Sequence, residues 1–208
     1  MPKLPLSFYQ QEDVVSVAKQ LLGKLLFTYV NGKLTGGIIT ETEAYDGVVD
    51  KACHAYGGRN TTRTATMFLG GGVTYVYLCY GIHHLLNVVS GKEGNPQAVL
   101  IRAIEPTVGI KTMLERRKME KLAPRITSGP GALSQALGID KQLNAKQLSD
   151  DEIWIEDAET FKDEEIVATT RIGVAYAQEH AFWPFRFYIK GNKYVSKPLK
   201  AKGLKLKD

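Results

Sequence analysis

Hydrophobic and polar residues follow two different periods along the chain. Between Asp13 and Leu22, apolar residues recur three to four positions apart and Gly23 follows, which is typical of a short helix that ends at a glycine. β-Branched and aromatic residues dominate 24–30 and 73–79, as expected for strands. Asn31 and Gly32 lie between the first of these and a second strand at 34–45, so they predict a tight hairpin turn.

The remaining pattern predicts one mixed α/β domain. Further strands are expected at 85–90, 98–104, 153–155, 172–175 and 186–189, and helices near 108–121 and 131–137. Residues 46–72 are rich in Gly, Thr and Arg and show little periodicity, and such a stretch inside a compact domain is usually functional or mobile. With no internal repeat and no clear linker, the chain is expected to fold around a largely antiparallel, curved sheet.

Composition narrows the class of protein. The chain has 208 residues, of which 44% are apolar and 24% charged, so a wholly disordered or fibrous chain is excluded. No apolar run approaches the length of a spanning helix, and the N-terminus has neither a long apolar stretch nor a small-residue cleavage site. We therefore expect a cytoplasmic protein without a membrane partner, in which Cys53 and Cys79 are free thiols.

Charge is distributed in opposed segments. The net charge of +5 combines a strongly basic segment after Arg186, a second basic segment at 111–125 and an acidic one at 140–165. Basic segments can form a footprint for nucleic acid, although 111–121 also fits an amphipathic helix with a solvated basic face. The Lys-rich segment 197–208 is predicted to be a flexible tail.

Two carboxylates stand two residues apart near the end of an apolar strand. On a strand, residues i and i+2 share a face, so Glu41 and Glu43 are expected to point the same way. A carboxylate in such a place can act as a general base on water. Two alternatives remain open: both acids are solvated at a strand end, or they form a carboxylate pair that hydrolyses free nucleosides or sugars.

Aromatic side chains are concentrated in the same part of the chain. Flat rings beside Arg59 and Arg63 are what a protein uses to sandwich a nucleobase. Tyrosines in a sheet can equally be core residues or cross-strand pairs. The rings in question fall within 36 residues: Tyr45, His54, Tyr56, Tyr75, Tyr77 and Tyr80.

Metal and nucleophile motifs are weak, so no metal and no cofactor is expected. The four histidines, His54, His83, His84 and His180, have no ligand pair at helical spacing. Cys53 beside His54 could in principle be a nucleophile, but a small packing residue is the simpler interpretation. The glycines at 70–72 and 128–131 are not followed by Lys-Ser/Thr, so neither is a P-loop; the second predicts a turn and a helix start, or a phosphate site.

Several motifs, taken in order, resemble one known family. ETEAY (41–45), His54, MF (67–68), TYVYLCYG (74–81), Asn87 and IRAIEP (101–106) are similar to the alkyladenine DNA glycosylases, also called 3-methyladenine DNA glycosylases. SGPGALSQAL (128–137), RIGV (171–174) and RFYIKG (186–191) extend the resemblance from about Phe8 to Ser196. It implies an α+β fold, a single domain over 1–196 whose helices flank the sheet and whose protruding β-hairpin inserts into DNA.

The resemblance also implies a function. The family hydrolyses the N-glycosidic bond of alkylated purines, and possibly of deaminated or etheno purines, after flipping them out of duplex DNA. The implied enzyme is a monomeric, metal-free, monofunctional glycosylase of base excision repair that leaves an abasic site, has no lyase activity and takes damaged double-stranded DNA as its partner. The resemblance assigns Glu43 and Arg102 to catalysis; Tyr45, Ala52, His54, Tyr77 and Asn87 to the base; and Tyr80 to intercalation. Arg59 and Arg63 beside the rings, and Ile82 just after Tyr80, are expected to contact the DNA.

Two other interpretations of the sequence stay open at this point. A non-catalytic nucleic-acid binding module would use the same rings and basic segments, but it has little use for a carboxylate that repels phosphates. The segment 128–131 also resembles the phosphate-binding hairpin of another glycosylase superfamily, in which a catalytic Asp soon after the motif would be required.

Overall fold

The computed structural model describes residues 1–199. Its order of elements confirms the predicted mixed class, with an antiparallel sheet and few helices. The α-helices are α1 (Leu6–Tyr9), α2 (Val14–Gln20), α3 (Ile110–Arg116) and α4 (Pro130–Leu137). The 3₁₀ turns are η1 (Tyr56–Gly58), η2 (Ala65–Phe68), η3 (Pro124–Ile126), η4 (Lys141–Leu143), η5 (Asp163–Glu165) and η6 (Ala175–Phe182). The strands are β1 (Leu25–Val30), β2 (Lys33–Tyr45), β3 (Thr74–Cys79), β4 (His83–Ser90), β5 (Gln97–Val108), β6 (Ile153–Glu156), β7 (Ile166–Thr169) and β8 (Arg186–Ile189).

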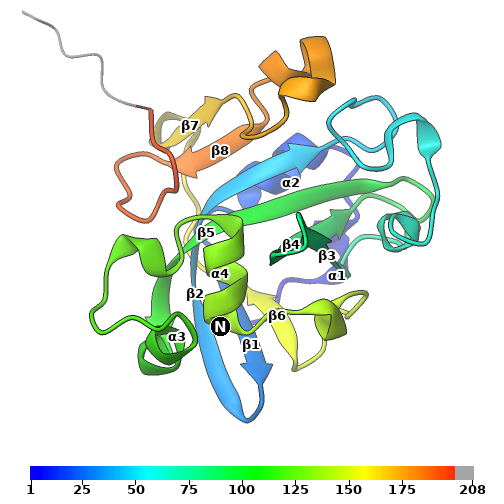
Figure 1. Ribbon diagram of the computed structural model, residues 1–208. Helices are drawn as coiled ribbons and strands as arrows, with labels where there is room; N and C mark the ends of the chain where they lie inside the picture. Colours follow the sequence, from blue (N-terminus) through cyan, green and yellow to red (C-terminus); the bar gives the residue numbers. More distant parts are fainter. Residues whose placement is uncertain (200–208) are drawn as a thin grey trace, which may run out of the picture.

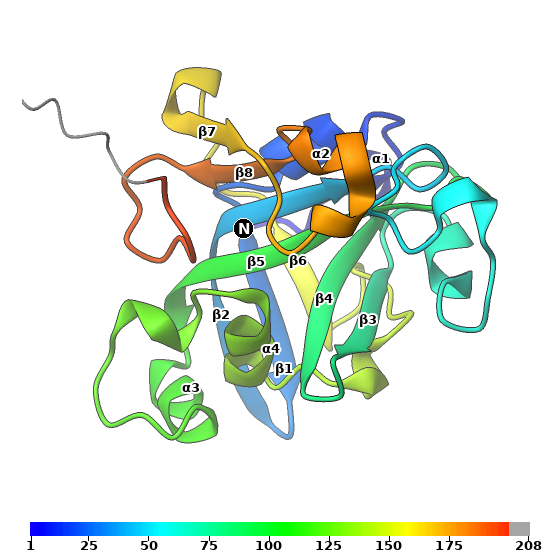
Figure 2. The ribbon, with the colours of Figure 1, turned by 45° about the horizontal axis from the view of Figure 1, so that its top comes forward.

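Long strands β2 and β5 form the centre of an eight-stranded sheet (Figures 1 and 2). The main path runs β3-β4-β5-β2-β1-β6, and β8 joins β2 and β7 beside it. Every strand pair is antiparallel. The sheet therefore follows the predicted pattern of hairpins rather than crossovers.

Strand β2 changes its partner halfway along. Residues 33–38 pair with β1, whereas Glu41, Thr42 and Glu43 pair with β8 on the same edge. The register with β5 shifts on both sides of Glu41, which marks an irregularity of the kind that bends a strand and re-aims its side chains. The sheet thus divides at the point where the two acids stand.

Helices cover the two faces of the sheet, and the two acids point to the face away from α2. In Figure 1, α4 lies in front of the sheet and α2 behind it. The Thr42 hydroxyl donates to the carbonyl oxygen of Ala18 in α2 at 2.9 Å. Because side chains alternate along a strand, Glu41 and Glu43 point to the opposite face, away from α2.

Hairpin turns match the glycine pattern. Asn31 and Gly32 have φ of 54° and 70°, and Tyr80 and Gly81 have φ of 50° and 69°. Positive φ at both central residues is the geometry of the type I′ turn, whose twist matches that of antiparallel strands. The amide of Ile82 closes the second turn on the carbonyl oxygen of Cys79 at 3.1 Å.

The prediction of a strand at 172–175 is wrong. These residues form a loop that leads into η6, and Gly173 has a φ of 79°, which no strand residue adopts. The amide of Ile172 donates to the Glu43 carboxylate instead of to a neighbouring strand. Sequence patterning also missed β7 and the short helix α1.

Two expectations concern the ends and the surface. Among residues 1–199, no helix combines the length and hydrophobicity that crossing a membrane requires. The predicted flexible tail begins at Lys197, so most of it lies outside the described residues. Its first described residues contact the domain: the Lys197 carbonyl oxygen accepts from Arg186 at 3.0 Å, and the Leu199 amide donates to the Tyr188 hydroxyl at 3.0 Å.

Candidate active site

Glu43 lies in the wall of a cavity of about 510 Å³ beside the β3–β4 hairpin. Its side chain is completely buried within the protein. The Ile172 amide donates to Oε1 at 2.8 Å, the Tyr45 hydroxyl donates to Oε2 at 2.8 Å, and Nη1 of Arg102 lies 3.3 Å from Oε1. Two hydrogen-bond donors and one guanidinium therefore hold the carboxylate at a fixed place in the cavity.

Burial controls the acidity of Glu43. Desolvation raises its pKa above the ordinary value, and Arg102, the Ile172 amide and the Tyr45 hydroxyl offset this only in part. A carboxylate with a raised pKa is a stronger base than a solvated one. The Glu43 carboxylate can therefore accept a proton from a water molecule that enters the cavity.

Glu41 shares the strand face with Glu43 but not the cavity. Both carboxylates contact Arg102, so they point the same way as the i, i+2 spacing predicted, yet only Glu43 lines the cavity. Burial raises the pKa of Glu41, but Arg102, Ser196 and Arg186 outweigh burial and hold the pKa below its ordinary value. One of the two acids is thus kept as an ion, and the other is made more basic.

Aromatic rings form one wall of the cavity. The ring centroids of His54 and Tyr77 are 4.7 Å apart, edge to face, and those of Tyr75 and Tyr77 are 5.3 Å apart. Tyr45 and Tyr80 also line the cavity. Of the six predicted rings only Tyr56 lies outside it, in the wall of a neighbouring cavity.

His54 is a neutral hydrogen-bonding group in this wall. Burial and the nearby Arg63 lower its pKa to about 4, so the imidazole carries no charge at neutral pH. Its Nε2 lies 3.4 Å from Nη2 of Arg63, and its Nδ1 lies 3.0 Å from the hydroxyl oxygen of Tyr75. Since a guanidinium only donates, Nε2 is the acceptor and Nδ1 carries the proton.

Arg59 and Arg63 line a second cavity, which adjoins the first. The second cavity, of about 430 Å³, shares Cys53, His54, Arg63 and Tyr176 with the first and adds Lys51 and Arg59. The Arg63 guanidinium lies 4.9 Å from the centroid of Tyr77, within range of a cation–π contact. Arg63 thus contacts the aromatic wall, whereas Arg59 lies in the neighbouring cavity.

Asn87 and Ala52 contribute further polar groups to the cavity. The Asn87 side chain is buried and donates to the carbonyl oxygen of Tyr75 at 3.0 Å, which fixes the orientation of the amide. The carbonyl oxygen of Ala52 accepts from the hydroxyl of Tyr176 at 3.0 Å. Tyr176 is a cavity residue that the sequence reasoning did not name.

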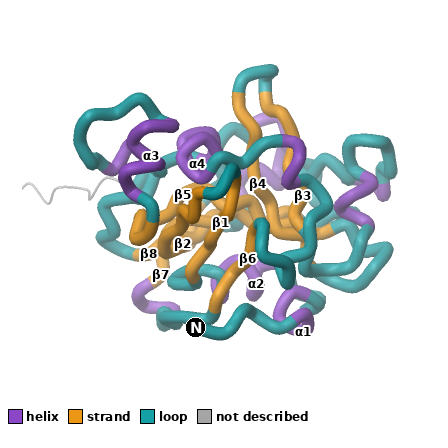
Figure 3. The backbone as a smooth tube through the Cα atoms, turned by 90° about the horizontal axis from the view of Figure 1, so that it is seen from below, coloured by secondary structure: helices purple, strands orange, loops and turns teal. Residues whose placement is uncertain are grey.

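The tip of the β3–β4 hairpin projects from the body of the protein (Figure 3). Tyr80 is 93% exposed and Ile82 is 71% exposed, although both are large apolar side chains. Tyr80 also lines the mouth of the cavity. The hairpin therefore presents an aromatic side chain to solvent at the cavity that also contains the buried carboxylate.

A buried ion pair supports the loop at 46–58. Arg171 contacts the carboxylate of Asp50, and its Nη1 donates to the carbonyl oxygen of Ala44 at 2.8 Å. Its guanidinium lies 4.8 Å from the centroid of Tyr45. Asp50 in turn accepts from the Ala52 amide at 2.9 Å, so the pair joins the loop to the cavity wall. The motif RIGV contains Arg171, but no spacing rule links it to Asp50.

Other sequence candidates have structural explanations. Burial raises the pKa of Cys53 to about 12, so its thiol is a packing group rather than a nucleophile. Within residues 1–199, no group of three or more His, Cys, Asp and Glu side chains is placed to hold a metal ion. Gly131, in α4, packs against His83, the first residue of β4 after the hairpin turn, where a side chain would clash.

Comparison with known proteins identifies the family. Residues 7–193 match the profile described as "Methylpurine-DNA glycosylase (MPG)". A Chlamydia pneumoniae protein named "Putative 3-methyladenine DNA glycosylase" is 48% identical over 88% of this chain and 92% of its own. A Clostridium acetobutylicum protein of the same name is 47% identical over 93% of this chain and 97% of its own. The chain belongs to the methylpurine-DNA glycosylase family.

Proposed function

We propose that the protein is a DNA glycosylase of base excision repair that removes alkylated purines, among them 3-methyladenine and 7-methylguanine, from duplex DNA. The observation that carries the proposal is the position of Glu43, a buried carboxylate of raised pKa in an aromatic-walled cavity beside an exposed hairpin tip. Membership of the family and the names of the relatives support the same class of activity.

Base flipping is the first step of the proposed reaction. The C1′ atom of a stacked nucleotide is inaccessible, so the enzyme extrudes the nucleotide at an unstacking cost of a few kcal/mol. Tyr80, exposed at the hairpin tip, would enter the space that the nucleotide leaves and offset part of this cost. Ile82, exposed at the hairpin tip, and Arg59 and Arg63, in the wall of the neighbouring cavity, would contact the DNA.

Recognition of the base follows from the cavity wall. A 3- or 7-alkylpurine is cationic, and the electron-rich rings of Tyr45 and Tyr77 attract a cation by roughly 0.5–2 kcal/mol. Neutral His54 adds no repelling charge. The Ala52 carbonyl oxygen would accept from a protonated N7 of a deaminated base, and the fixed Asn87 amide would crowd the exocyclic amino group of guanine.

Glu43 would perform the chemical step. Its carboxylate takes a proton from a water molecule, the water oxygen forms a bond to C1′, and the N-glycosidic bond breaks with its electron pair leaving on the purine. Arg102, 3.3 Å from Glu43, would hold the carboxylate and the water. The residues that line the cavity, all from the described part of the chain, include no lysine, so we expect no Schiff base and no strand cleavage.

An excision assay tests the proposal. The protein is incubated with duplexes that each contain one lesion (3-methyladenine analogue, 7-methylguanine, hypoxanthine or ethenoadenine), and abasic sites are then cleaved with alkali. We expect release of at least one alkylated base with multiple turnover, and cleavage only after alkali. Absence of excision above background on every lesion would contradict the proposal.

Two arms of the same assay separate the alternatives. A binding module would retain lesion duplex without releasing base. A nucleoside hydrolase would act on free inosine. Its carboxylate pair is not supported, because Glu41 does not line the cavity and its oxygens already accept hydrogen bonds from Arg102, Arg186 and Ser196.

A further inference from the structure

Glu41 is a completely buried carboxylate that the proposed chemistry does not use. It accepts four hydrogen bonds: from Nε of Arg102 at 2.9 Å, from Nη1 of Arg186 at 2.8 Å, and from the amide and hydroxyl of Ser196 at 2.6 and 3.0 Å. Two guanidiniums and a segment far away in the sequence therefore converge on one side chain. Burying a carboxylate costs desolvation free energy, and these four hydrogen bonds compensate for that cost. A residue kept at such a cost can have a role beyond stability.

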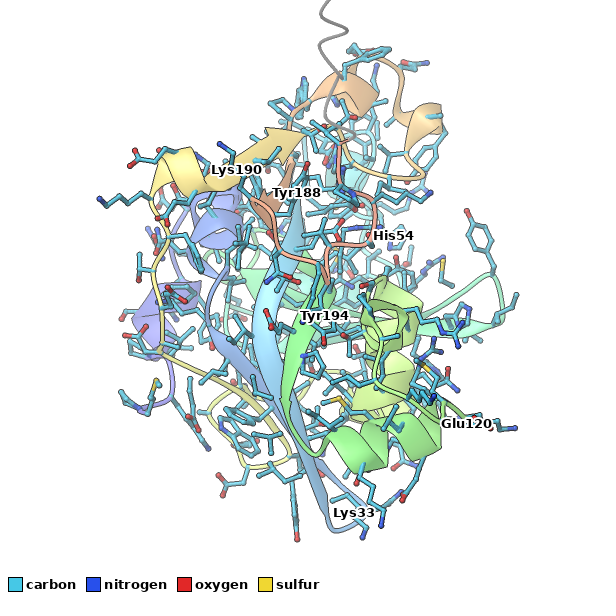
Figure 4. The ribbon with its side chains drawn as sticks, turned by 90° about the vertical axis from the view of Figure 1, so that its left-hand side faces the viewer. Lys33, His54, Glu120, Tyr188, Lys190 and Tyr194 are labelled. Carbon is cyan, nitrogen blue, oxygen red and sulfur yellow. The ribbon has the colours of Figure 1, made fainter. Side chains whose placement is uncertain are left out.

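The segment at 192–199, here called the C-terminal strap, brings Ser196 to this place. After β8 the chain turns back across the sheet, and Tyr194 becomes buried beside β5 and α4 (Figure 4). The hydroxyl of Ser128 lies 2.7 Å from the carbonyl oxygen of Tyr194, and Arg186 donates to that of Lys197 at 3.0 Å. The strap is thus fastened on both sides of Ser196.

Arg102 connects Glu41 to Glu43. Its Nε donates to Glu41, its Nη2 donates to the Ser196 hydroxyl at 3.4 Å, and its Nη1 lies 3.3 Å from Oε1 of Glu43. Each of its three nitrogens therefore has its own partner, and the planar guanidinium has one orientation. Its positive charge is shared between two carboxylates instead of neutralising Glu43 alone.

We propose that Glu41 and Ser196 are positioning residues, which hold Arg102 at the distance from Glu43 that leaves this carboxylate basic. The inference rests on the proposed function and adds the C-terminal strap to the catalytic machinery. Without Glu41, Arg102 can move onto Glu43, and the repulsion between the two carboxylates disappears. Both changes favour the ionised form of Glu43, so they make it a weaker base.

A purely structural role for Glu41 and Ser196 predicts something different. If they only stabilised the fold, their removal would lower the melting temperature without moving the pH dependence of excision. The acid limb of the single-turnover rate, which follows the ionisation of Glu43, separates the two roles.

Ser196→Ala is the mild variant, because Ser196 is only partly buried and the substitution removes one hydroxyl. We expect the single-turnover excision rate to fall by about tenfold through loss of alignment, with lesion binding changed less than about twofold. Ser196→Thr, which keeps the hydroxyl, should restore most of the rate. Ser149→Ala, at an exposed serine outside the strap, is the matched control and should equal the original protein.

Glu41→Gln tests the charge. We expect a fall in rate of about a hundredfold and an acid limb shifted to lower pH. Should this variant not fold, the Ser196→Ala and Ser196→Thr pair decides. Normal rates and an unmoved acid limb in a folded Glu41→Gln and in Ser196→Ala would overturn the inference and leave the proposed function intact. Absence of excision by the unsubstituted protein would overturn both.

Discussion

The cavity around Glu43 and the tip of the β3–β4 hairpin are neighbours, yet they are built in opposite ways. Glu43 is fully buried and held by two hydrogen bonds and an ion pair, whereas Tyr80 is 93% exposed at the hairpin tip. The first region has its interactions within the folded protein before any ligand arrives. The second leaves an aromatic side chain uncovered, so its interactions must come from a partner.

This difference indicates a division of labour. A pre-organised polar site stabilises charge without rearrangement during a reaction, which suits a chemical step. An exposed apolar side chain at a type I′ turn suits insertion between bases, because it can bury its apolar surface only when the protein binds a partner. Substitutions in the two regions should therefore have different signatures in catalysis, binding and stability.

The largest effect is expected at Glu43. Glu43→Gln should lower the single-turnover excision rate by about 10²- to 10⁴-fold, because the amide cannot accept the proton of the attacking water. Lesion binding should persist, and the melting temperature at pH 7 should stay equal or rise, since burial opposes the charge of Glu43. Rates are measured with enzyme in excess, beside Glu12→Gln, which removes an exposed acid. Normal turnover by Glu43→Gln would remove Glu43 from the reaction.

Tyr80→Ala should reduce excision from duplex DNA by about 10- to 100-fold, because unstacking is then no longer offset. The same lesion in a single strand should be affected much less, since no stack has to be filled. The melting temperature should not change, given the exposure of Tyr80. Tyr29→Ala, at an exposed tyrosine of β1, is the control. Equal losses on duplex and single strand would contradict the wedge.

The pH dependence should carry the signature of the cavity. Excision should fall about tenfold for each pH unit below the pKa of Glu43, and this limb should lie above pH 4.5, since burial raises that pKa. His54, with a pKa of about 4, should add no limb near neutrality. A rate that stays constant down to pH 4.5 would contradict the raised pKa.

Stability should depend on pH with opposite signs at the two acids. The raised pKa of Glu43 means that its contribution to the free energy of unfolding is greatest below pH 4.5 and is lost as pH rises through its folded value. The lowered pKa of Glu41 makes its contribution present above pH 4.5 and lost as pH falls through its folded value. Melting curves of Glu43→Gln against pH should therefore diverge from those of the original protein as pH rises.

The smallest effect is expected at the arginines of the second cavity. Arg59→Ala should weaken binding to damaged and undamaged duplex alike and reduce the slope of log affinity against log salt by about one. Lys33→Ala removes a charge at the far end of the β1–β2 hairpin, remote from His54 in Figure 4, and should leave the slope unchanged. Equal slopes for both variants would show that Arg59 does not contact the DNA.

Local patterning predicted most of the sheet but not the loop that serves the site. The Asn31-Gly32 turn and the β-branched strands have signals within a few residues, and the structure confirms them. The segment 172–175 has the apolar composition of a strand, yet the Ile172 amide bonds to Glu43, which is 129 positions away in the sequence. A hydrogen bond formed by tertiary packing leaves no period in the local sequence.

The candidate site shows the same limit. The spacing of Glu41 and Glu43 predicted a shared face, but it did not show that Arg102 divides them into one residue inside the cavity and one outside. The roles of Ala52 and Asn87 came from the family resemblance alone. Tyr176, Arg186 and Ser196 lie in segments of ordinary composition. Their part in the site is seen only from their contacts in the folded chain.

The C-terminal strap also makes the support of Arg102 depend on a late part of the chain. Glu41 leaves the ribosome early, whereas its hydrogen-bond donor Ser196 follows 155 positions later. Folding during synthesis proceeds from the N-terminus. A chain that stopped before the strap would lack the donors of Ser196, so the support of Arg102 would be complete only once the strap had been translated.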